Sequence, residues 1–351
     1  MGKRRRKAER HAAPASQPAA APTPGRRRIL LLISLALTGL VFLPSLLNGF
    51  VGLDDPGYLL ANPTVKTVTL ENVKTMLTQP FVGTYLPITM FSYMVEYQLF
   101  GLEPFGYHLT NLVLHLLCTV LVFLITERLV GHTVVAFVTS TLFGIHTLHV
   151  ESVAWIAARK DVLYAVGFLL ALYFYLRHLK SGRSFSGWYW ASLLAFVLAA
   201  LAKAQAVILP IVLILVDLLL KRDVSIKALA RKVPFFIPAV ALGAIAIVVQ
   251  RSAGAVSEFN TAPPPYRILL AFYALLNYLW RLVLPINLSC LYPYPVTDGR
   301  IDTHWVFLSP LVLLAVGAVA YRVARTSREI LFGIAFFCLL ICCVAPSSCG
   351  V

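Results

Sequence analysis

Residues 29–47 read ILLLISLALTGLVFLPSLL, a run of 19 residues that carries no charged side chain. An α-helix crosses a bilayer core with about 20 consecutive apolar residues, so this run predicts a membrane-spanning helix. The run follows a basic segment, as the apolar part of a secretory signal peptide would, but no small-residue cleavage pattern comes after it. We therefore interpret 29–47 as an uncleaved first span.

Comparable apolar runs recur along the rest of the chain. We predict full spans at 29–47, 107–126, 133–149, 162–179, 188–202, 205–220, 234–250, 305–321 and 330–346. The composition agrees, because 59% of the residues are apolar and only 13% are charged, whereas soluble domains carry about 25% charged residues. The sequence thus predicts an all-α, polytopic transmembrane helical bundle over 29–346.

A tenth apolar segment, near 267–285, differs from the nine predicted spans in its polar residues and in the stretch that follows it. It contains Asn277 and Arg281, and it leads into LPINLSCLYPYP, a stretch broken by proline and rich in tyrosine. Aromatic residues of this kind gather at membrane interfaces. We therefore expect a re-entrant or interfacial element over 267–304, which makes nine full spans plus one such element.

The first 28 residues form a basic arm that accounts for +8 of the net charge of +15. Between its two basic clusters lies APASQPAAAPTPG, a Pro/Ala-rich stretch that cannot build a core. We predict a disordered cytoplasmic arm that is attracted to anionic lipid headgroups, and we expect no nucleic-acid partner.

The distribution of Lys and Arg predicts the orientation, because basic residues favour the cytoplasmic side of short loops. The basic arm and the basic loops 180–187 and 221–232 then lie inside, and the acidic first loop, 48–106, lies outside. The odd number of spans places the C terminus outside. The loop 150–161 lies on the same outer side as the first loop.

Two adjacent carboxylates follow the first span, Asp54 and Asp55 in GFVGLDDPGYLLANP. Neighbouring carboxylates repel each other, which raises the pKa of one of them and favours a proton acceptor. The alternative is an ordinary solvated acidic turn.

A second polar group occupies IHTLHVESVAWIAARKD, residues 145–161. Imidazole, carboxylate and cationic side chains on one outer surface predict an anion site, since Arg forks onto phosphate oxygens and Lys adds a point charge. The candidates are His146, His149, Glu151, Arg159 and Lys160. Two alternatives stay open: interfacial snorkelling of the two cations, and a divalent metal on the His and Glu residues, for which no full ligand set is evident.

A third group centres on Lys203, in LAKAQAVILP between two predicted spans on the outer side. It either holds a phosphate or snorkels to the interface. Four more polar side chains on or near that side are candidate substrate contacts, namely Tyr58, Tyr85, His108 and Arg281. Together these groups suit a phosphate-linked substrate that arrives from the bilayer.

The order of these segments resembles a known family. LDDPGYLLANP, YLPITMFSYMVEYQLFGLEPFGYHLTNLVLH, HTLHVESVAWIAARKDVL, LAKAQAVILPIVLILVDLL and LPINLSCLYPYP follow one another as in the membrane half of the transmembrane and tetratricopeptide-repeat O-mannosyltransferases and their bacterial relatives. These are members of the GT-C glycosyltransferase superfamily. The resemblance covers roughly residues 29–340.

The resemblance implies transfer of a mannose-like hexose from a polyprenyl-phosphate donor to a hydroxyl acceptor, a protein Ser/Thr or a glycan, on the outer face. Asp54 or Asp55 would be the base. The donor phosphate would lie among the anion-site residues His146, His149, Glu151, Arg159, Lys160 and Lys203. The resemblance implies no cofactor. A divalent cation bound by the His and Glu residues stays an open alternative.

The sequence departs from the family pattern in three places. One is Ala204, where relatives often have Glu or Pro after the lysine. Thr147 stands where the family usually has proline after the first His, and the sequence ends in CCVAPSSCGV, whereas relatives continue into repeats of about 34 residues. We expect a truncated tail at 347–351 without a repeat domain, in a bacterial inner membrane protein. The alternatives are a transporter or flippase for a lipid-linked or anionic solute, or an inactive scaffold protein.

Overall fold

The computed structural model describes residues 24–222, 224–254, 264–286, 288–289, 292, 295–297, 300–301 and 303–344. Most of the predicted basic arm and the predicted tail at 347–351 lie outside this range. Helix α1 (Pro24–Phe42) already includes Arg26 to Arg28, which the sequence had assigned to the arm. Proline is tolerated in the first turn of a helix, so the helix begins before the apolar run does.

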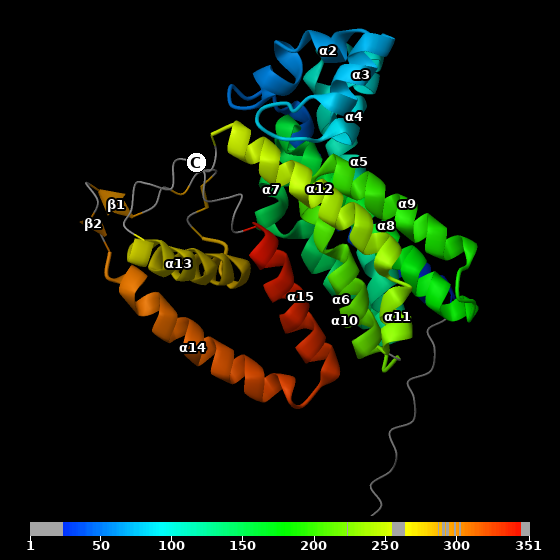
Figure 1. Ribbon diagram of the computed structural model, residues 1–351, viewed down its shortest axis with the longest axis vertical. Coiled ribbons are helices and arrows are strands. Elements are labelled where there is room, and N and C mark those ends of the chain that lie inside the picture. The colour runs from blue at the N-terminus through cyan, green and yellow to red at the C-terminus, as the bar shows by residue number, and fades with distance from the viewer. Residues whose placement is uncertain are drawn as a thin grey trace, which may run out of the picture.

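The described part of the chain is built almost entirely of helices, which confirms the predicted all-α class (Figure 1). The longer ones after α1 are α5 (Pro104–Val130), α6 (Thr133–Ile145), α8 (Arg159–Ser181), α9 (Gly187–Ala202), α10 (Leu209–Leu219), α12 (Val233–Ser252), α13 (Pro264–Val283), α14 (Trp305–Ala324) and α15 (Arg328–Val344). The only described strands, β1 (Val296–Thr297) and β2 (Arg300–Ile301), form one antiparallel pair.

Five helical segments are long and apolar enough to cross a membrane, which supports an integral membrane protein. They are Pro24–Leu47, Pro104–Val130, Ile156–Ser181, Val233–Ser252 and Trp305–Ala324. A sixth is possible if the bent pair Thr133–Ile145 and Thr147–Ala154, which meet at 49°, counts as one span. The predicted nine crossings are therefore not confirmed, and α9 and the segment Ala204–Leu219 are shorter apolar helices.

The predicted span 133–149 ends early. Helix α6 stops at Ile145, where the Nδ1 atom of His146 accepts the Leu148 N–H at 3.2 Å. The short helices η3 (Thr147–His149), α7 (Val150–Ala154) and η4 (Ile156–Ala158) follow before α8 begins. Residues 145–161 therefore form a series of short helices instead of one continuous helix, and this determines which of their side chains lie at the surface.

The bundle is held together by close helix contacts at small and hydroxylated residues. Helix α8 packs on α9 and α5, and α1 packs on α6. A Cβ atom on Gly167 would lie 2.8 Å from the Cβ of Ala199, so α8 and α9 touch along their backbones. The Ser34 and Ser140 hydroxyls join α1 to α6 at 3.1 Å. Hydroxyl pairs of this kind are common between membrane helices.

The predicted first loop, 48–106, is a folded unit that we call the cap. It contains η2 (Pro56–Leu60), α2 (Pro63–Lys66), α3 (Leu70–Thr78) and α4 (Pro87–Phe100), and it lies at the upper end of the bundle in Figure 1. Its core consists of side chains with almost no exposed surface, including Leu59, Val65, Met76 and Met90. The acidic loop is thus a helical layer with a hydrophobic centre.

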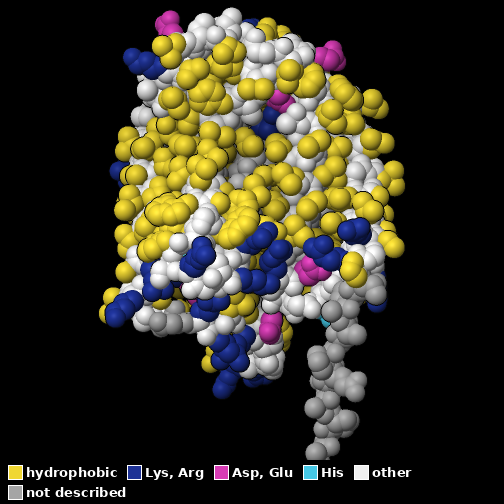
Figure 2. Space-filling view, turned by 90° about the vertical axis from the view of Figure 1, so that its right-hand side faces the viewer, with side chains coloured by type: hydrophobic (Ala, Val, Ile, Leu, Met, Phe, Trp, Pro, Cys, Tyr) yellow, Lys and Arg dark blue, Asp and Glu magenta, His cyan; other side chains and the backbone are white. Residues whose placement is uncertain are grey.

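The opposite end of the molecule is basic. Figure 2 shows a broad hydrophobic band with Lys and Arg side chains gathered below it. Two contacts belong to this end: the Arg27 guanidinium lies 2.8 Å from the Glu127 carboxylate, and Arg222 donates to the Leu179 carbonyl at 2.8 Å. We call it the basic end. Helix α13 lies to the side of the main bundle in Figure 1, packs on α14, and is not among the candidate spans.

Candidate functional site

The two adjacent aspartates lie in different surroundings. Asp55 is fully buried, and its carboxylate accepts the Val51 N–H at 2.7 Å and the Ala157 N–H at 2.9 Å. Burial raises the pKa of the Asp55 carboxyl, and the two backbone hydrogen bonds oppose that rise. Asp55 therefore ties the cap to η4, and both of its oxygens are already engaged.

Asp54 is the accessible carboxylate of the pair. Its side chain is 33% exposed, and one of its oxygens lies 3.4 Å from Lys160 Nζ. The same ammonium group lies 3.5 Å from the Tyr58 hydroxyl and 5.0 Å from the centre of the Tyr58 ring. The structure thus brings together three of the predicted site residues, Asp54, Tyr58 and Lys160.

A second ion pair lies beside the first. Lys203, which ends α9, contacts the carboxylate of Asp161 in the first turn of α8. Glu151 of α7 is exposed and within electrostatic reach of Lys160, Asp161 and Lys203. The cap end therefore carries two lysines that are each about one-fifth exposed, together with three partly exposed carboxylates. Figure 2 shows a small group of acidic and basic side chains within the hydrophobic surface near the upper end.

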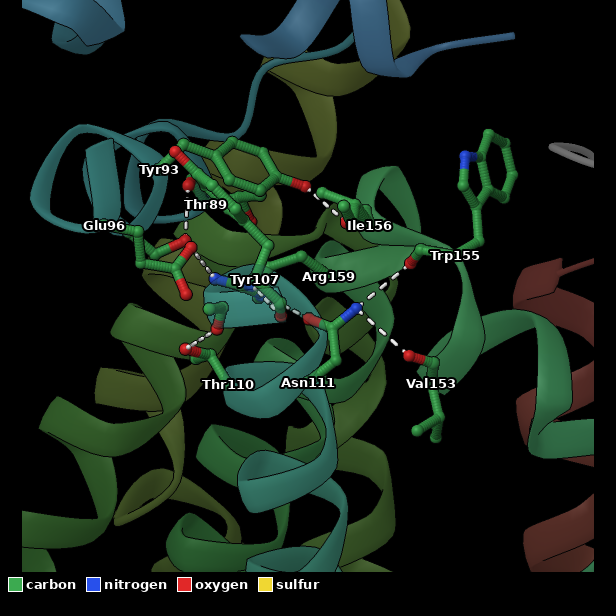
Figure 3. A network of polar contacts seen from close by, with 12 residues as sticks. Thr89, Tyr93, Glu96, Tyr107, Thr110, Asn111, Val153, Trp155, Ile156 and Arg159 are labelled. Atoms are coloured by element: carbon green, nitrogen blue, oxygen red, sulfur yellow. Dashed lines mark hydrogen bonds and ion pairs between the residues drawn. The ribbon is translucent and has the colours of Figure 1, made fainter. Parts of the chain in front are cut away.

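Arg159 does not lie with these residues, contrary to the sequence-based expectation. Its side chain is fully buried and contacts the Glu96 carboxylate and the Asn111 side-chain oxygen, and it donates to the Tyr107 carbonyl at 2.8 Å (Figure 3). Consecutive residues of a helix point about 100° apart, so Lys160 faces outward when Arg159 faces inward. We therefore leave Arg159 out of the proposed phosphate ligands.

The buried network around Arg159 shapes the break before α8. The Asn111 side-chain nitrogen donates to the Trp155 carbonyl at 3.0 Å, and the Tyr93 hydroxyl donates to the Ile156 carbonyl at 2.8 Å. The same two carbonyls also accept the backbone N–H groups of Ala158 and Arg159 at the end of η4, so the side chains reinforce this short helix. Burial raises the pKa of Glu96, and the adjacent guanidinium opposes that rise. Sequence reasoning missed Glu96 and Asn111, although a lone Glu in the apolar run of α4 signals a buried partner.

The two histidines lie apart from the lysines. The Nε2 atom of His146 lies 3.1 Å from the Leu282 carbonyl at the end of α13, and the ring of His149 packs 4.6 Å from that of Phe143. Within the described residues, no hydrogen bond or ion pair joins either imidazole to Lys160 or Lys203. In the same part of the chain, no three His, Cys, Asp or Glu side chains gather closely enough to hold a metal ion.

The remaining candidate substrate contacts are spread over the structure. The Tyr85 hydroxyl donates to the Leu77 carbonyl inside the cap at 2.8 Å. His108 is fully buried on α5, within electrostatic reach of Asp55. The Arg281 guanidinium stacks on the Tyr292 ring at 3.4 Å. Of the four, only Tyr58 directly contacts the lysine–carboxylate group.

The comparisons with known proteins point to one group of relatives. The chain is 33% identical to the protein O-mannosyl-transferase Tmtc1 of Drosophila melanogaster over 48% of its own length and 20% of that protein. It is 26% identical to a protein O-mannosyl-transferase of Caenorhabditis elegans over 87% of its own length and 45% of that protein. It is 32% identical to human TMTC2 over 41% of its length and 18% of that protein.

The matched region thus spans less than half the length of these curated relatives. No family model matches the chain, and no solved structure matches it significantly.

The fold and the site define an all-helical integral membrane protein with a lysine–carboxylate group at one end of its bundle. The sequence similarities then identify the group to which it is related. The chain is a relative of the TMTC-type protein O-mannosyl-transferases, and the predicted family resemblance is confirmed.

Proposed function

We propose that this chain is the membrane domain of a glycosyltransferase that moves a mannosyl group from a polyprenyl-phosphate donor to a protein hydroxyl. The type of reaction comes from the relatives, which are named protein O-mannosyl-transferases. The observation that carries the proposal for this chain is the partly exposed Asp54 carboxylate, 3.4 Å from Lys160 at the cap end. A base and a phosphate-binding cation are adjacent there, as this chemistry requires.

In this proposal Asp54 accepts the proton of the acceptor hydroxyl. A general base must come within hydrogen-bond reach of that proton, and Asp54 is the exposed member of the pair. Asp55 is the positioning residue, because its two oxygens hold the backbone of the cap and of η4.

Lys160 and Lys203 would bind the phosphate of the donor, which is the leaving group. Negative charge grows on that phosphate as the bond to the sugar breaks, and nearby ammonium groups stabilise it. Asp161 and Glu151 hold the two lysines in place before the donor binds. The two histidines, His146 and His149, would then line the edge of the site toward α13 rather than contact the phosphate.

The orientation belongs to the same proposal. We place the basic end in the cytoplasm, in line with the positive-inside tendency, and the cap on the outer face. Nine crossings remain our proposal, in which the bent pair that begins with α6 and the shorter helices α9, α10 and α15 join the five candidate spans. The relatives named above are animal proteins, so the bacterial inner membrane stays a prediction.

The test compares Asp54→Asn with Glu71→Gln in the purified chain, reconstituted in liposomes. Glu71 is an exposed acid on α3 of the cap and serves as the matched control. With polyprenyl-phosphate mannose and a Ser/Thr-containing acceptor peptide, we expect the Asp54 variant to lose roughly a hundredfold or more in rate. The control should keep the rate of the parent. A fully active Asp54→Asn protein would refute the assignment of the base.

A further inference from the structure

A concave hollow at the basic end is lined by three cations. It has a volume of about 310 Å³, and its lining residues are Arg128, Arg177, Lys180, Ser181 and Trp188. These residues come from the C-terminal ends of α5 and α8 and from the start of α9. The hollow is thus a corner where three helix ends meet, at the opposite end of the bundle from Asp54 and Lys160.

The positive charge of this hollow has no acidic counterpart in its lining. Within the described residues, none of the five ion pairs uses Arg128, Arg177 or Lys180. Glu127, the nearest acid in sequence, points to Arg27 and also accepts the Thr133 hydroxyl. Three like charges around one cavity repel each other, and an anion in the cavity would relieve that repulsion.

Aromatic rings fix the two guanidinium groups in place. Arg177 lies over the Trp188 ring at 4.0 Å, and Arg128 lies over the Tyr173 ring at 4.2 Å and donates to its hydroxyl at 2.9 Å. Arg128 also donates to the Leu124 carbonyl at 3.2 Å, which leaves its other N–H groups for an anion. Stacking leaves the N–H edge of Arg177 available for the oxygens of a phosphate. The two arginines are therefore already ordered, so binding an anion costs little additional side-chain entropy.

The surroundings of the hollow indicate where the anion comes from. Trp188, Trp190 and Phe185 are 37%, 56% and 51% exposed and lie at the start of α9 or just before it. Exposed aromatic side chains gather at the level of lipid headgroups. A neighbouring hollow of about 370 Å³ shares Ser181 and Trp188 and adds a fourth cation, Arg183. A lipid headgroup at this depth could reach all four cations.

We propose that this hollow binds the phosphate of an anionic lipid headgroup from the leaflet at the basic end. The site is separate from the proposed donor site and does not depend on the proposed activity. Its ligand is a phosphodiester or phosphomonoester with a net negative charge. Arg177 contacts the phosphate oxygens through its guanidinium edge, Arg128 contacts them through the N–H groups that it does not donate to Leu124 and Tyr173, and Lys180 adds charge at the rim.

The experiment measures lipid binding to the full chain, purified in a neutral detergent. Native mass spectrometry and thermal unfolding are followed during titration with phosphatidylglycerol, with phosphatidylcholine and with inorganic phosphate. We expect phosphatidylglycerol to be retained and to raise the unfolding midpoint, and the other two probes to have little effect. For R177Q/K180Q we expect the apparent affinity for phosphatidylglycerol to fall roughly tenfold or more, because each basic residue contributes to headgroup attraction.

The matched control is R322Q/R325Q, which removes the same charge from exposed positions at the end of α14. It should change the affinity by less than about twofold. Lys180→Gln alone, at an exposed position, cannot disturb packing and should lower the affinity about threefold. Equal losses in the control and the test variant, or none in either, would overturn the proposal. So would protection by inorganic phosphate that matches protection by the lipid, because the ligand would then be a soluble anion.

Discussion

Replacing Arg159 with methionine tests whether the buried network before α8 is an electrostatic unit. Arg159 is fully buried, and it contacts the carboxylate of Glu96 and the side-chain oxygen of Asn111. Removing one partner of a buried ion pair leaves the other charge unpaired and costs about 3–5 kcal/mol. We expect Arg159→Met to lower the free energy of unfolding by that amount.

The double variant Glu96→Met with Arg159→Met separates charge from packing. It removes both charges, so only the Asn111 oxygen and the Tyr107 carbonyl lose a donor, at about 1–3 kcal/mol. We therefore expect the double variant to recover roughly half of the loss caused by Arg159→Met. Reversible unfolding in mixed micelles, followed by tryptophan fluorescence, gives the three free energies.

The pH dependence of Arg159→Met provides the second readout. Burial already raises the pKa of Glu96 above its ordinary value of 4.5, and loss of the guanidinium raises it further. The folded protein then binds a proton more tightly than the unfolded chain does. Stability of the variant should therefore fall as the pH rises above about 4.5 toward the raised pKa, and the double variant should lack this slope. Parent-like stability of Arg159→Met, or a double variant weaker than the single one, would contradict the reasoning.

Three further predictions follow from the packing and the site. Gly167→Ala should cost about 1–3 kcal/mol, because its Cβ would press on Ala199 at 2.8 Å, whereas Gly243→Ala, with open space around it, should be neutral in the same unfolding assay. Lys160→Gln should raise the KM for polyprenyl-phosphate mannose at least tenfold without lowering the unfolding midpoint; an unchanged KM would remove Lys160 from the donor site. Because the pKa of Asp55 is raised in the folded protein, the cap should lose stability as the pH rises above about 3.8. The rate of proteolysis of the cap should therefore rise with pH, and Asp55→Asn should abolish this pH dependence.

Much of the fold could be predicted from hydrophobic patterning alone. Each of the nine predicted spans coincides with helical structure, because apolar runs of this length form helices in a bilayer. The number of membrane crossings is harder to predict from the sequence. Helices α9 and α10 are shorter than a bilayer core requires, so their position relative to the membrane depends on tertiary packing. The break at His146 was also missed, because the His146 side chain caps the short helix η3 after α6, and hydrophobic patterning does not reveal such a cap.

The site was predicted in part. Asp54, Tyr58 and Lys160 do come together, and Lys203 joins the group through Asp161. The sequence could not assign different environments to adjacent residues, because a difference of about 100° around a helix decides which one is buried. Arg159 was grouped with its exposed neighbour Lys160 for this reason. Asp55 differs from Asp54 for another reason, because the backbone N–H groups of Val51 and Ala157 hold its side chain inside.

The attachment of the cap restricts how substrates reach the lysine–carboxylate group. Among the contacts that fasten the cap to the ends of the membrane helices are hydrogen bonds from Ala157 N–H to Asp55 at 2.9 Å, from Tyr93 to the Ile156 carbonyl at 2.8 Å, and from Thr89 to the Ala202 carbonyl at 3.0 Å. Under the proposed function, this attachment favours entry of the lipid-linked donor sideways from the bilayer and approach of the acceptor peptide along the membrane surface, by two separate routes.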